Sequence, residues 1–256
     1  MNHHDNHSSL PGTQCKLVVV QDGLQPCPYL DGVNARMPLR LPVGAVTPAV
    51  TDQLLASGYR RSGDFVYRAQ CPSCDECKPT RIEVGKFVHT TSMKRVKKRG
   101  DRDLVCHLSM PSVDEKRVWL FNEHRRQRGL GLDSGLVDAD GYRAFLFDSC
   151  CDTRELSILL NGELVAIAIL DIGQDSTSAV YTHFDPAASR YSLGTYSILK
   201  QIEWATESQR SYVYLGMYVA DNDHLNYKAR LLPQQRLIKE KWVAFDAAGR
   251  EVSPVA

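Results

Sequence analysis

The sequence contains no long apolar segment. Its longest uninterrupted apolar run covers residues 164–170, seven residues, whereas a helix that crosses a bilayer needs about 20. The N-terminus has no basic stretch followed by an apolar one, so we expect no secretory signal. These absences argue against a membrane-spanning or exported protein, and we expect the chain to fold in the reducing cytoplasm.

A large excess of charge of one sign is also lacking. The net charge is only +1, so the protein as a whole is not a general binder of polyanions. Basic side chains are instead concentrated locally, in a larger cluster of Lys94, Arg95, Lys97, Lys98, Arg99 and Arg102 and a smaller one of Arg125, Arg126 and Arg128. Such a cluster can hold phosphates or be a solvated helix face, and charge alone leaves both open.

Cysteine, by contrast, is plentiful. Eight cysteines without a secretory signal favour free thiols or metal ligands over a disulfide framework. Three of them form a Cys71-x-x-Cys74-x-x-Cys77 run, a spacing that recurs in zinc and iron–sulfur sites. A closed tetrahedral site needs one more ligand, so either a distant residue completes it or the run holds no metal. Four other cysteines show no ligand spacing and are expected to pack in the core: Cys15, Cys106, Cys150 and Cys151.

The first part of the chain has a mixed pattern. Residues 1–14 lack periodicity, and we expect a disordered tail there. Residues 15–107 are expected to form an N-terminal module that contains the cysteine run. Its predicted elements are a helix at 48–57 ended by Gly58, strands at 65–69 and 80–84, and a helix from Thr91 or Ser92 that carries the larger basic cluster.

Residues 108–256 are expected to form a second domain. The predicted elements are a helix from the capping box Ser112-Val-Asp-Glu115 to about 128, a helix at 140–149, strands at 156–160, 163–171 and 179–184, a helix at 193–206, and strands at 212–215 and 237–245. Asn161-Gly162 between two apolar runs predicts a hairpin. This order describes an α/β (α+β) protein with a mixed sheet and helices on both faces. It is also the order of the GNAT (acyl-CoA N-acyltransferase-like) fold.

Five sequence blocks occur in a recognisable order between Cys27 and Leu237. They are Cys27-Pro-Tyr-Leu30; Gly58-Tyr-Arg-Arg-Ser-Gly63 followed by Tyr67-Arg68, the cysteine run and Pro79-x-Arg81; Ser92-Met-Lys-Arg95; Tyr181-Thr-His-Phe-Asp-Pro186 with Ser192-Leu-Gly-Thr195; and Tyr214-Leu-Gly216 with Asn226-Tyr-Lys-Ala-Arg230 and Pro233. On these blocks the chain resembles the bacterial aspartate/glutamate leucyltransferases, relatives of the arginyl-tRNA–protein transferases. Four single residues depart from the family pattern: Met93, His183, Met217 and Leu231.

The resemblance implies an aminoacyl-tRNA–protein transferase with a GNAT-like C-terminal half. Such an enzyme moves leucine from Leu-tRNA to the α-amine of proteins that begin with Asp or Glu, which marks them for degradation. Arginine from Arg-tRNA is the alternative donor. A GNAT acetyltransferase is less favoured, because the loop before Gly194 lacks the second glycine of the pyrophosphate-binding motif. A non-enzymatic RNA-binding module would leave the second domain without a role.

The chemistry needs no nucleotide-binding loop and no strong base, because an activated ester is attacked by an amine with a pKa of about 7.7–8.0. Our catalytic candidates are Asp185, Tyr181 and Tyr214. Asp185 precedes a proline and can equally serve a turn, and tyrosines in strands pack by default. His183 departs from the family, and we assign it no catalytic role.

The remaining candidates concern binding. For tRNA or the acidic acceptor they are Arg60, Arg61, Lys94, Arg95, Lys97, Lys98, Arg99, Gly194, Tyr227, Lys228 and Arg230, with plain surface or salt-bridge roles as the alternative. Related arginyltransferases resemble this chain in carrying paired cysteines at the same two places. This implies that Cys27 could join Cys71, Cys74 and Cys77 around zinc or an iron–sulfur cluster, the alternative being four reduced thiols. No cofactor is required for the transfer itself.

Overall fold

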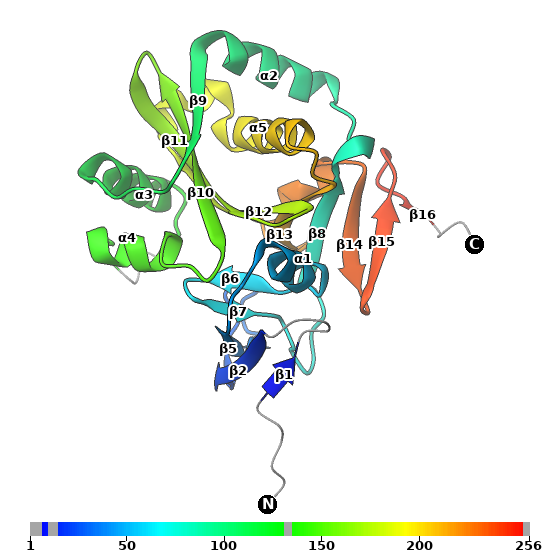
Figure 1. Cartoon of the computed structure of the whole chain (residues 1–256). Coiled ribbons are helices and arrows are strands. Elements are labelled where there is room, and N and C mark those ends of the chain that lie inside the picture. The colour runs from blue at the N-terminus through cyan, green and yellow to red at the C-terminus, as the bar shows by residue number, and fades with distance from the viewer. Residues whose placement is uncertain (1–6, 10–14, 131–134, 253–256) are drawn as a thin grey trace, which may run out of the picture.

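The large sheet of the protein dominates its architecture. The computed structural model describes residues 7–9, 15–130 and 135–252. Within them, nine strands form a mixed sheet in the order β16-β15-β14-β8-β13-β12-β11-β10-β9 (Figure 1). These strands are β8 (Lys78–Glu83), β9 (Leu104–Ser109), β10 (Asp152–Leu160), β11 (Glu163–Ile172), β12 (Ser176–Phe184), β13 (Tyr212–Tyr218), β14 (Gln234–Ile238), β15 (Lys241–Phe245) and β16 (Glu251–Val252).

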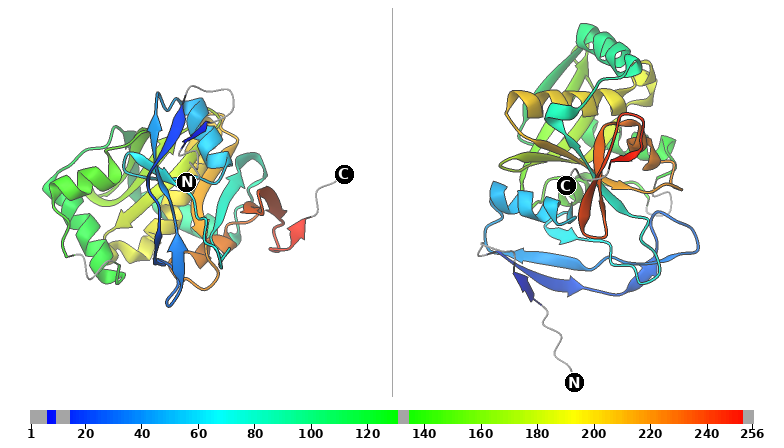
Figure 2. Two further views of the ribbon diagram at one scale, coloured as in Figure 1. Left: turned by 90° about the horizontal axis from the view of Figure 1, so that it is seen from below. Right: turned by 90° about the vertical axis from the view of Figure 1, so that its right-hand side faces the viewer.

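A smaller sheet comes from the N-terminal part of the chain and lies against one end of the large one (Figure 2). Its strand order is β1-β2-β5-β7-β6, and β3 and β4 form a separate two-stranded ribbon. The strands are β1 (His7–Ser9), β2 (Lys16–Gln21), β3 (Leu24–Pro26), β4 (Asn34–Arg36), β5 (Leu39–Val43), β6 (Arg60–Ser62) and β7 (Phe65–Tyr67). Of the tail expected at 1–14, residues 7–9 pair with β2, and the rest lies outside the described residues.

Helices cover both faces of the large sheet (Figure 1). They are α1 (Pro48–Ala56), α2 (Thr91–Asp103), α3 (Glu115–Gln127), α4 (Ala139–Leu146) and α5 (Leu193–Glu207), with short 3-10 turns η1 (Val84–Lys86), η3 (Pro186–Tyr191) and η4 (Asn226–Arg230). In β11, Ala166 and Ala168 pack in a core with residues of α5, while Ile167 and Ile169 pack with α3 and α4. The apolar run at 164–170 is therefore a strand covered on both sides, and the expected fold class is confirmed.

Most of the expected elements form, including the hairpin, in which Asn161 and Gly162 take the positive φ of 51° and 86° that this turn requires. Two expectations were wrong. The helix expected from Ser112 begins at Glu115, because the Asp114 carboxylate caps it by accepting from the N–H of Arg117 at 2.8 Å. The strand expected at 237–245 is two strands, β14 and β15, joined by a tight turn.

The two expected domains share the large sheet. β8 precedes residue 108 and β9 begins before it, yet β8 pairs with β13 and β14 and β9 pairs with β10. The boundary expected near residue 107 stays a prediction. In the part of the chain that the structure describes, no helix is long and apolar enough to cross a membrane.

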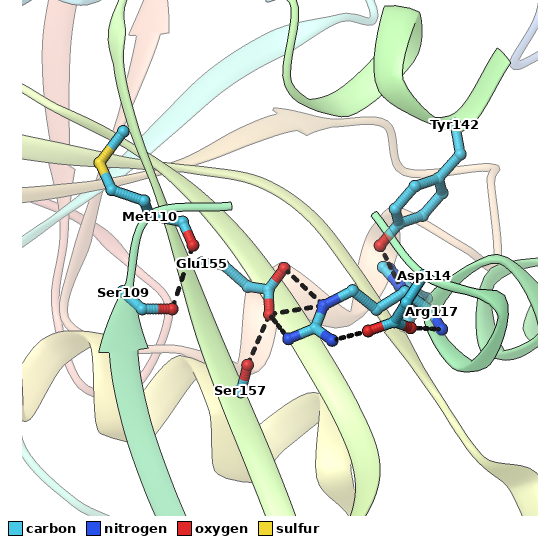
Figure 3. Close-up of polar contacts among 8 residues, drawn as sticks. Ser109, Met110, Asp114, Arg117, Tyr142, Glu155 and Ser157 are labelled. Carbon is cyan, nitrogen blue, oxygen red and sulfur yellow. Dashed lines mark hydrogen bonds and ion pairs between the residues drawn. The ribbon is translucent and has the colours of Figure 1, made fainter. Parts of the chain in front are cut away.

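A buried ion pair fixes α3 to the large sheet (Figure 3). The Glu155 side chain on β10 is fully buried, and its Oε1 lies 2.8 Å from Nη2 of Arg117. Ser157 donates to the same carboxylate at 2.5 Å, and Asp114 accepts from the other side of the guanidinium. The carboxylate is thus surrounded by donors from two elements, and Arg117 is the only cation that neutralises it among the contacts of the described residues.

Replacing Arg117 should leave Glu155 buried and unpaired. We expect Arg117→Met to lower the free energy of unfolding by about 3–5 kcal/mol, the usual effect of breaking a buried pair, as measured by urea denaturation. The matched control is Arg126→Met on the same helix, which removes an exposed pair with Glu123 and should leave the midpoint nearly unchanged. Equal midpoint shifts in the two variants would contradict this view of the Arg117–Glu155 pair.

Candidate functional site

The two parallel strands at the centre of the large sheet separate after a short contact. β12 and β13 pair only from Ser176–Tyr212 to Ser178–Tyr214. Just beyond this point each strand carries a β-bulge, with Val180 the extra residue on β12 and Leu215 the extra residue on β13. Because bulges bend the strand that contains them, the strands diverge. We call this opening between their C-terminal ends the β12–β13 fork.

Arg60, on β6 of the small sheet, extends into the β12–β13 fork. Its side chain is buried, with the residue only 8% exposed, and its Nη2 donates to the backbone oxygen of Ala179 at 3.1 Å. Gly216 has a φ of +84°, and a Cβ at this residue would lie 3.3 Å from Nη2 of Arg60. Glycine therefore serves both the bulge and the close approach of the guanidinium. The N-terminal part of the chain thus supplies the positive charge of Arg60 at a fork that is formed by two strands of the C-terminal part.

Lys228, on η4, is a second buried cation beside Arg60. The residue is 3% exposed, and its Nζ lies 4.9 Å from the centre of the Tyr227 ring. Burial, and then the charge of Arg60, lower the pKa of Lys228 to about 7. In the described part of the chain no carboxylate forms an ion pair with Lys228. A buried lysine and arginine without such a partner form an electropositive site of a kind that is typical of functional centres.

The catalytic candidates lie around this site without contacting one another. Asp185 follows β12, and its Oδ1 accepts from the N–H of Ala187 at 2.9 Å, which caps η3. Tyr181 packs in an aromatic cluster with Phe121, at 5.4 Å between ring centres. The hydroxyl of Tyr214 accepts from Nη1 of Arg81 at 2.9 Å. Each therefore has a structural role, and their catalytic roles stay predictions.

The binding candidates near the fork are Gly194, Tyr227 and Arg230. Gly194 lies in the first turn of α5, where a Cβ would be 3.4 Å from the Phe184 ring at the end of β12. The Tyr227 ring is 39% exposed, and Arg230 is exposed at the end of η4. The first turn of α5 thus borders the end of β12, and Tyr227 and Arg230 flank the buried Lys228 on η4.

Arg61 has a different environment from its neighbour Arg60. Its Nε donates to Oδ2 of Asp171 at 2.8 Å, and both side chains are only 3% exposed. The pair joins β6 of the small sheet to β11 of the large one. Because its charge is already neutralised in the core, Arg61 is poorly placed to bind phosphate or a substrate carboxylate.

The basic cluster lies on α2, as expected, but its members differ. Lys97 pairs with Asp101 at 2.5 Å and with Glu203 at 3.0 Å, and Arg99 donates to the backbone oxygen of Arg190. The exposed cations of α2 that form neither an ion pair nor a side-chain hydrogen bond with a described residue are Lys94, Arg95 and Lys98. These three are therefore the members of the cluster best suited to contact phosphate groups.

The four cysteines proposed as ligands line one pocket of about 220 Å³, between the β3–β4 ribbon and β14. Burial, and then Cys27, Cys71 and Cys74, raise the pKa of Cys77 to about 12. Metal binding would have to remove this proton. Among the described residues no group of three or more His, Cys, Asp or Glu side chains is arranged to hold a metal ion, so metal binding at these cysteines stays a prediction.

Sequence reasoning missed two tyrosines that join the cysteine pocket to the fork. The hydroxyls of Tyr29 and Tyr67 share a hydrogen bond, and the charges of Cys77 and Arg60 both act on Tyr29. Burial raises the pKa of Tyr29, so its hydroxyl stays protonated. Both residues lie inside the recognisable sequence blocks, and this was the signal in the sequence that could have marked them as functional. The cysteine pocket and the fork are therefore neighbours.

A larger pocket, of about 630 Å³, lies between α3 and α4 and is lined by apolar side chains that include Val118 and Trp119. It contains none of the candidate residues. Two of its lining carboxylates, Asp114 and Glu123, are paired with Arg117 and Arg126, and we place the candidate site at the fork.

Two family models match the chain. One, described as arginine-tRNA-protein transferase, N terminus, matches residues 25–95, and the other, described as arginine-tRNA-protein transferase, C terminus, matches residues 116–238. The first match includes the cysteine run, Arg60 and the start of α2. The second includes β12, β13 and Lys228, so both models are needed to cover the fork.

Curated relatives match over most of their length. An aspartate/glutamate leucyltransferase of Chromobacterium violaceum is 36% identical over 85% of this chain and 89% of its own. One of Polynucleobacter asymbioticus is 33% identical over 86% and 90%. Among solved structures, a GCN5-related N-acetyltransferase from Kribbella flavida is 15% identical and covers 60% of this chain and 52% of its own, with a TM-score of 0.35.

Lys228 should lower the stability of the protein. With a pKa of about 7 in the folded state and about 10.4 when unfolded, the unfolded chain binds more protons between these values, so stability rises with pH there. We expect Lys228→Met to raise the free energy of unfolding at pH 7 by at least about 1 kcal/mol, and the gain to shrink towards pH 10.

The control for this experiment is Lys200→Met. Lys200 is paired with Glu203 at 2.9 Å, and its removal should bring no gain in stability at either pH. Urea denaturation at several pH values provides the comparison. A Lys228→Met variant that is less stable than wild type by the same amount at every pH would contradict the assignment of a buried, unpaired cation.

Proposed function

Because the chain belongs to the family of the aspartate/glutamate leucyltransferases, and is therefore an aminoacyl-tRNA–protein transferase, we propose that it moves leucine from Leu-tRNA to proteins with N-terminal Asp or Glu. The identity and coverage of the relatives support the family. Leucine as the transferred residue follows from their names, and arginine from Arg-tRNA remains the second candidate because of the matching family models. We place the reaction in the cytoplasm, where aminoacyl-tRNA is made.

The proposed reaction is the aminolysis of an ester. The acceptor's α-amine attacks the carbonyl carbon of the aminoacyl ester, a C–N bond forms, and the bond to the tRNA ribose oxygen breaks. The proton lost by the amine ends on that oxygen or in solvent. Positioning of ester and amine can supply up to about 7–11 kcal/mol of the barrier. We locate this chemistry at the β12–β13 fork, with Tyr181 on β12 and Asp185 just after it as the candidates, while Tyr214 is engaged with Arg81.

The observation that carries the proposal is the buried pair of cations, Arg60 and Lys228. An acceptor with N-terminal Asp or Glu brings a carboxylate, which is the partner that this pair lacks among the described residues. Pairing would compensate the buried charge of both cations. An isosteric amide brings no charge and would leave the pair uncompensated, which gives a physical basis for acidic acceptors.

The surface of α2 supports tRNA as the other partner. Lys94, Arg95 and Lys98 are exposed cations without an ion pair in the described part of the chain. α2 packs on α5 through contacts such as the hydrogen bond from the Tyr196 hydroxyl to Asp101, at 3.0 Å, and α5 begins beside the fork. A tRNA held along α2 could therefore extend its 3′ end to the fork.

We also propose that Cys27, Cys71, Cys74 and Cys77 bind zinc or an iron–sulfur cluster. The support is the chemistry of the donors and their common pocket; binding would need the four sulfurs to close in on the ion. Protein purified without oxygen should contain zinc or iron, and Cys74→Ser should lower that content several-fold. Absence of both metals from the wild-type protein would end this proposal.

The direct test of function uses labelled leucine. Purified protein should transfer it from Leu-tRNA to a peptide that begins with Asp or Glu, and not to one that begins with Lys. Substituting labelled Arg-tRNA in the same assay decides between leucyl and arginyl transfer. Absence of transfer from either tRNA to any acceptor would refute the proposed function.

The role of α2 is tested by its unpaired cations. We expect the triple variant Lys94→Ala, Arg95→Ala, Lys98→Ala to bind tRNA more weakly and with a shallower dependence on salt, because each lost phosphate contact lowers the slope of log K against log salt by about 0.7–0.9. Lys97→Ala is the matched control, since its charge is engaged with Asp101 and Glu203. A triple variant with an unchanged slope would place the tRNA elsewhere.

A further inference from the structure

A second group of thiols lies apart from the cysteine pocket. Cys150 and Cys151 lie in the segment between α4 and β10, and their Sγ atoms are 3.8 Å apart. Cys15, just before β2, is buried in the core against which Cys150 packs. The spacing of these cysteines in the sequence predicted no role for them. Cys15 is far from the other two in sequence, and only the fold brings it close to Cys150.

The two neighbouring thiols have different acidities. The hydrogen bond between the two thiols lowers the pKa of Cys150; burial and the charge of Asp171 act against this shift, and the charge of Arg61 supports it. The pKa of Cys151 is raised, by that hydrogen bond and by burial. One Arg61 nitrogen, Nη1, is buried without a hydrogen-bond partner among the described residues. A thiolate at Cys150 is therefore stabilised mainly by the neighbouring Cys151 thiol, 3.8 Å away.

Two other thiols, Cys106 and Cys15, lack this environment. Burial raises the pKa of Cys106, which shares a hydrogen bond with the Tyr196 hydroxyl at 3.7 Å. Burial and the neighbouring Cys150 raise that of Cys15, which is 1% exposed. Cys150 is half-buried and so within reach of small reagents. Oxidisable thiols combine such access with a stabilised thiolate and a second thiol nearby.

We propose that Cys150 and Cys151 form an oxidisable dithiol, in which Cys150 is the nucleophile and Cys151 the resolving thiol. The oxidant is a peroxide. The Cys150 thiolate attacks one peroxide oxygen, an S–O bond forms, the O–O bond breaks, and hydroxide leaves and takes up a proton. The Cys151 sulfur then attacks the sulfenic acid, an S–S bond forms and a second water leaves. The two thiols lose two electrons in total, which reduce one hydrogen peroxide to two waters.

The dithiol borders a contact that joins the two sheets. Asp171 accepts from Arg61 at 2.8 Å and from the Thr153 hydroxyl at 2.7 Å, and Ser149 binds both Thr153 and the Cys151 backbone. Oxidation removes the thiolate next to Arg61 and tightens the segment that carries Ser149. A disulfide between adjacent residues is strained and hence readily reduced, so the modification should reverse.

The experiment treats the full-length protein with limiting hydrogen peroxide and maps the products by mass spectrometry of peptides. Wild type should form a Cys150–Cys151 disulfide that dithiothreitol reverses. Cys151→Ser should instead stop at a Cys150 sulfenic acid that dimedone traps, and Cys150→Ser should give neither product. Circular dichroism of both variants establishes that they fold.

Alkylation provides an independent measurement on unmodified wild-type protein. At pH 7 Cys150 should react with iodoacetamide at least about 10-fold faster than Cys106, the half-buried thiol whose hydrogen-bond partner is a tyrosine hydroxyl. Equal rates at Cys150 and Cys106 would overturn the proposal. So would a disulfide that joins Cys150 to Cys15, or to a thiol of the cysteine pocket, in place of Cys151.

Discussion

The site depends on one buried guanidinium at the point where two parallel strands part. Arg60 extends into the β12–β13 fork, donates to the Ala179 carbonyl and lies against Gly216, whose φ of +84° and close approach to the guanidinium both favour glycine. Arginine stays charged even when buried. The fork therefore keeps a fixed positive charge, and burial together with that charge lowers the pKa of Lys228 beside it. A strongly basic lysine would resist burial, and this one is accommodated because it can lose its proton.

This arrangement explains why neither half of the chain can hold the site alone. Arg60 comes from the small sheet, whereas the two strands of the fork and Lys228 come from the second half. β8 joins the two parts by pairing between β13 and β14. Tyr29 and Tyr67 then connect Arg60 to Cys77 of the cysteine pocket. A change in the protonation or metal binding of those cysteines would therefore act first on these two tyrosines. The cysteine pocket is thus a neighbour of the proposed reaction site and not a part of it.

The sequence predicted local structure well and long-range placement poorly. Periodicity and the Asn161-Gly162 turn located most elements, because those signals are local. The start of α3 was misplaced because Ser112 and Asp114 are both good caps, and only tertiary contacts choose between them. Arg60 and Arg61 are adjacent in sequence, yet one extends into the fork and the other is neutralised by Asp171. Their partners lie 119 and 110 residues away, so no local pattern could predict that the two arginines have different roles. The burial of Lys228 also depends on distant residues and could not be predicted from the local sequence.

The central claim is that buried positive charge at the fork selects the acidic acceptor. It is tested most directly by comparing initial rates of leucyl transfer to two peptides that differ only in N-terminal Asp or Asn, for wild type and for folded Lys228→Met. We expect wild type to prefer Asp by at least about 10-fold, the effect of about 1.4 kcal/mol, and the variant to lose most of this preference. A variant that transfers more slowly but keeps the full preference for Asp would contradict it.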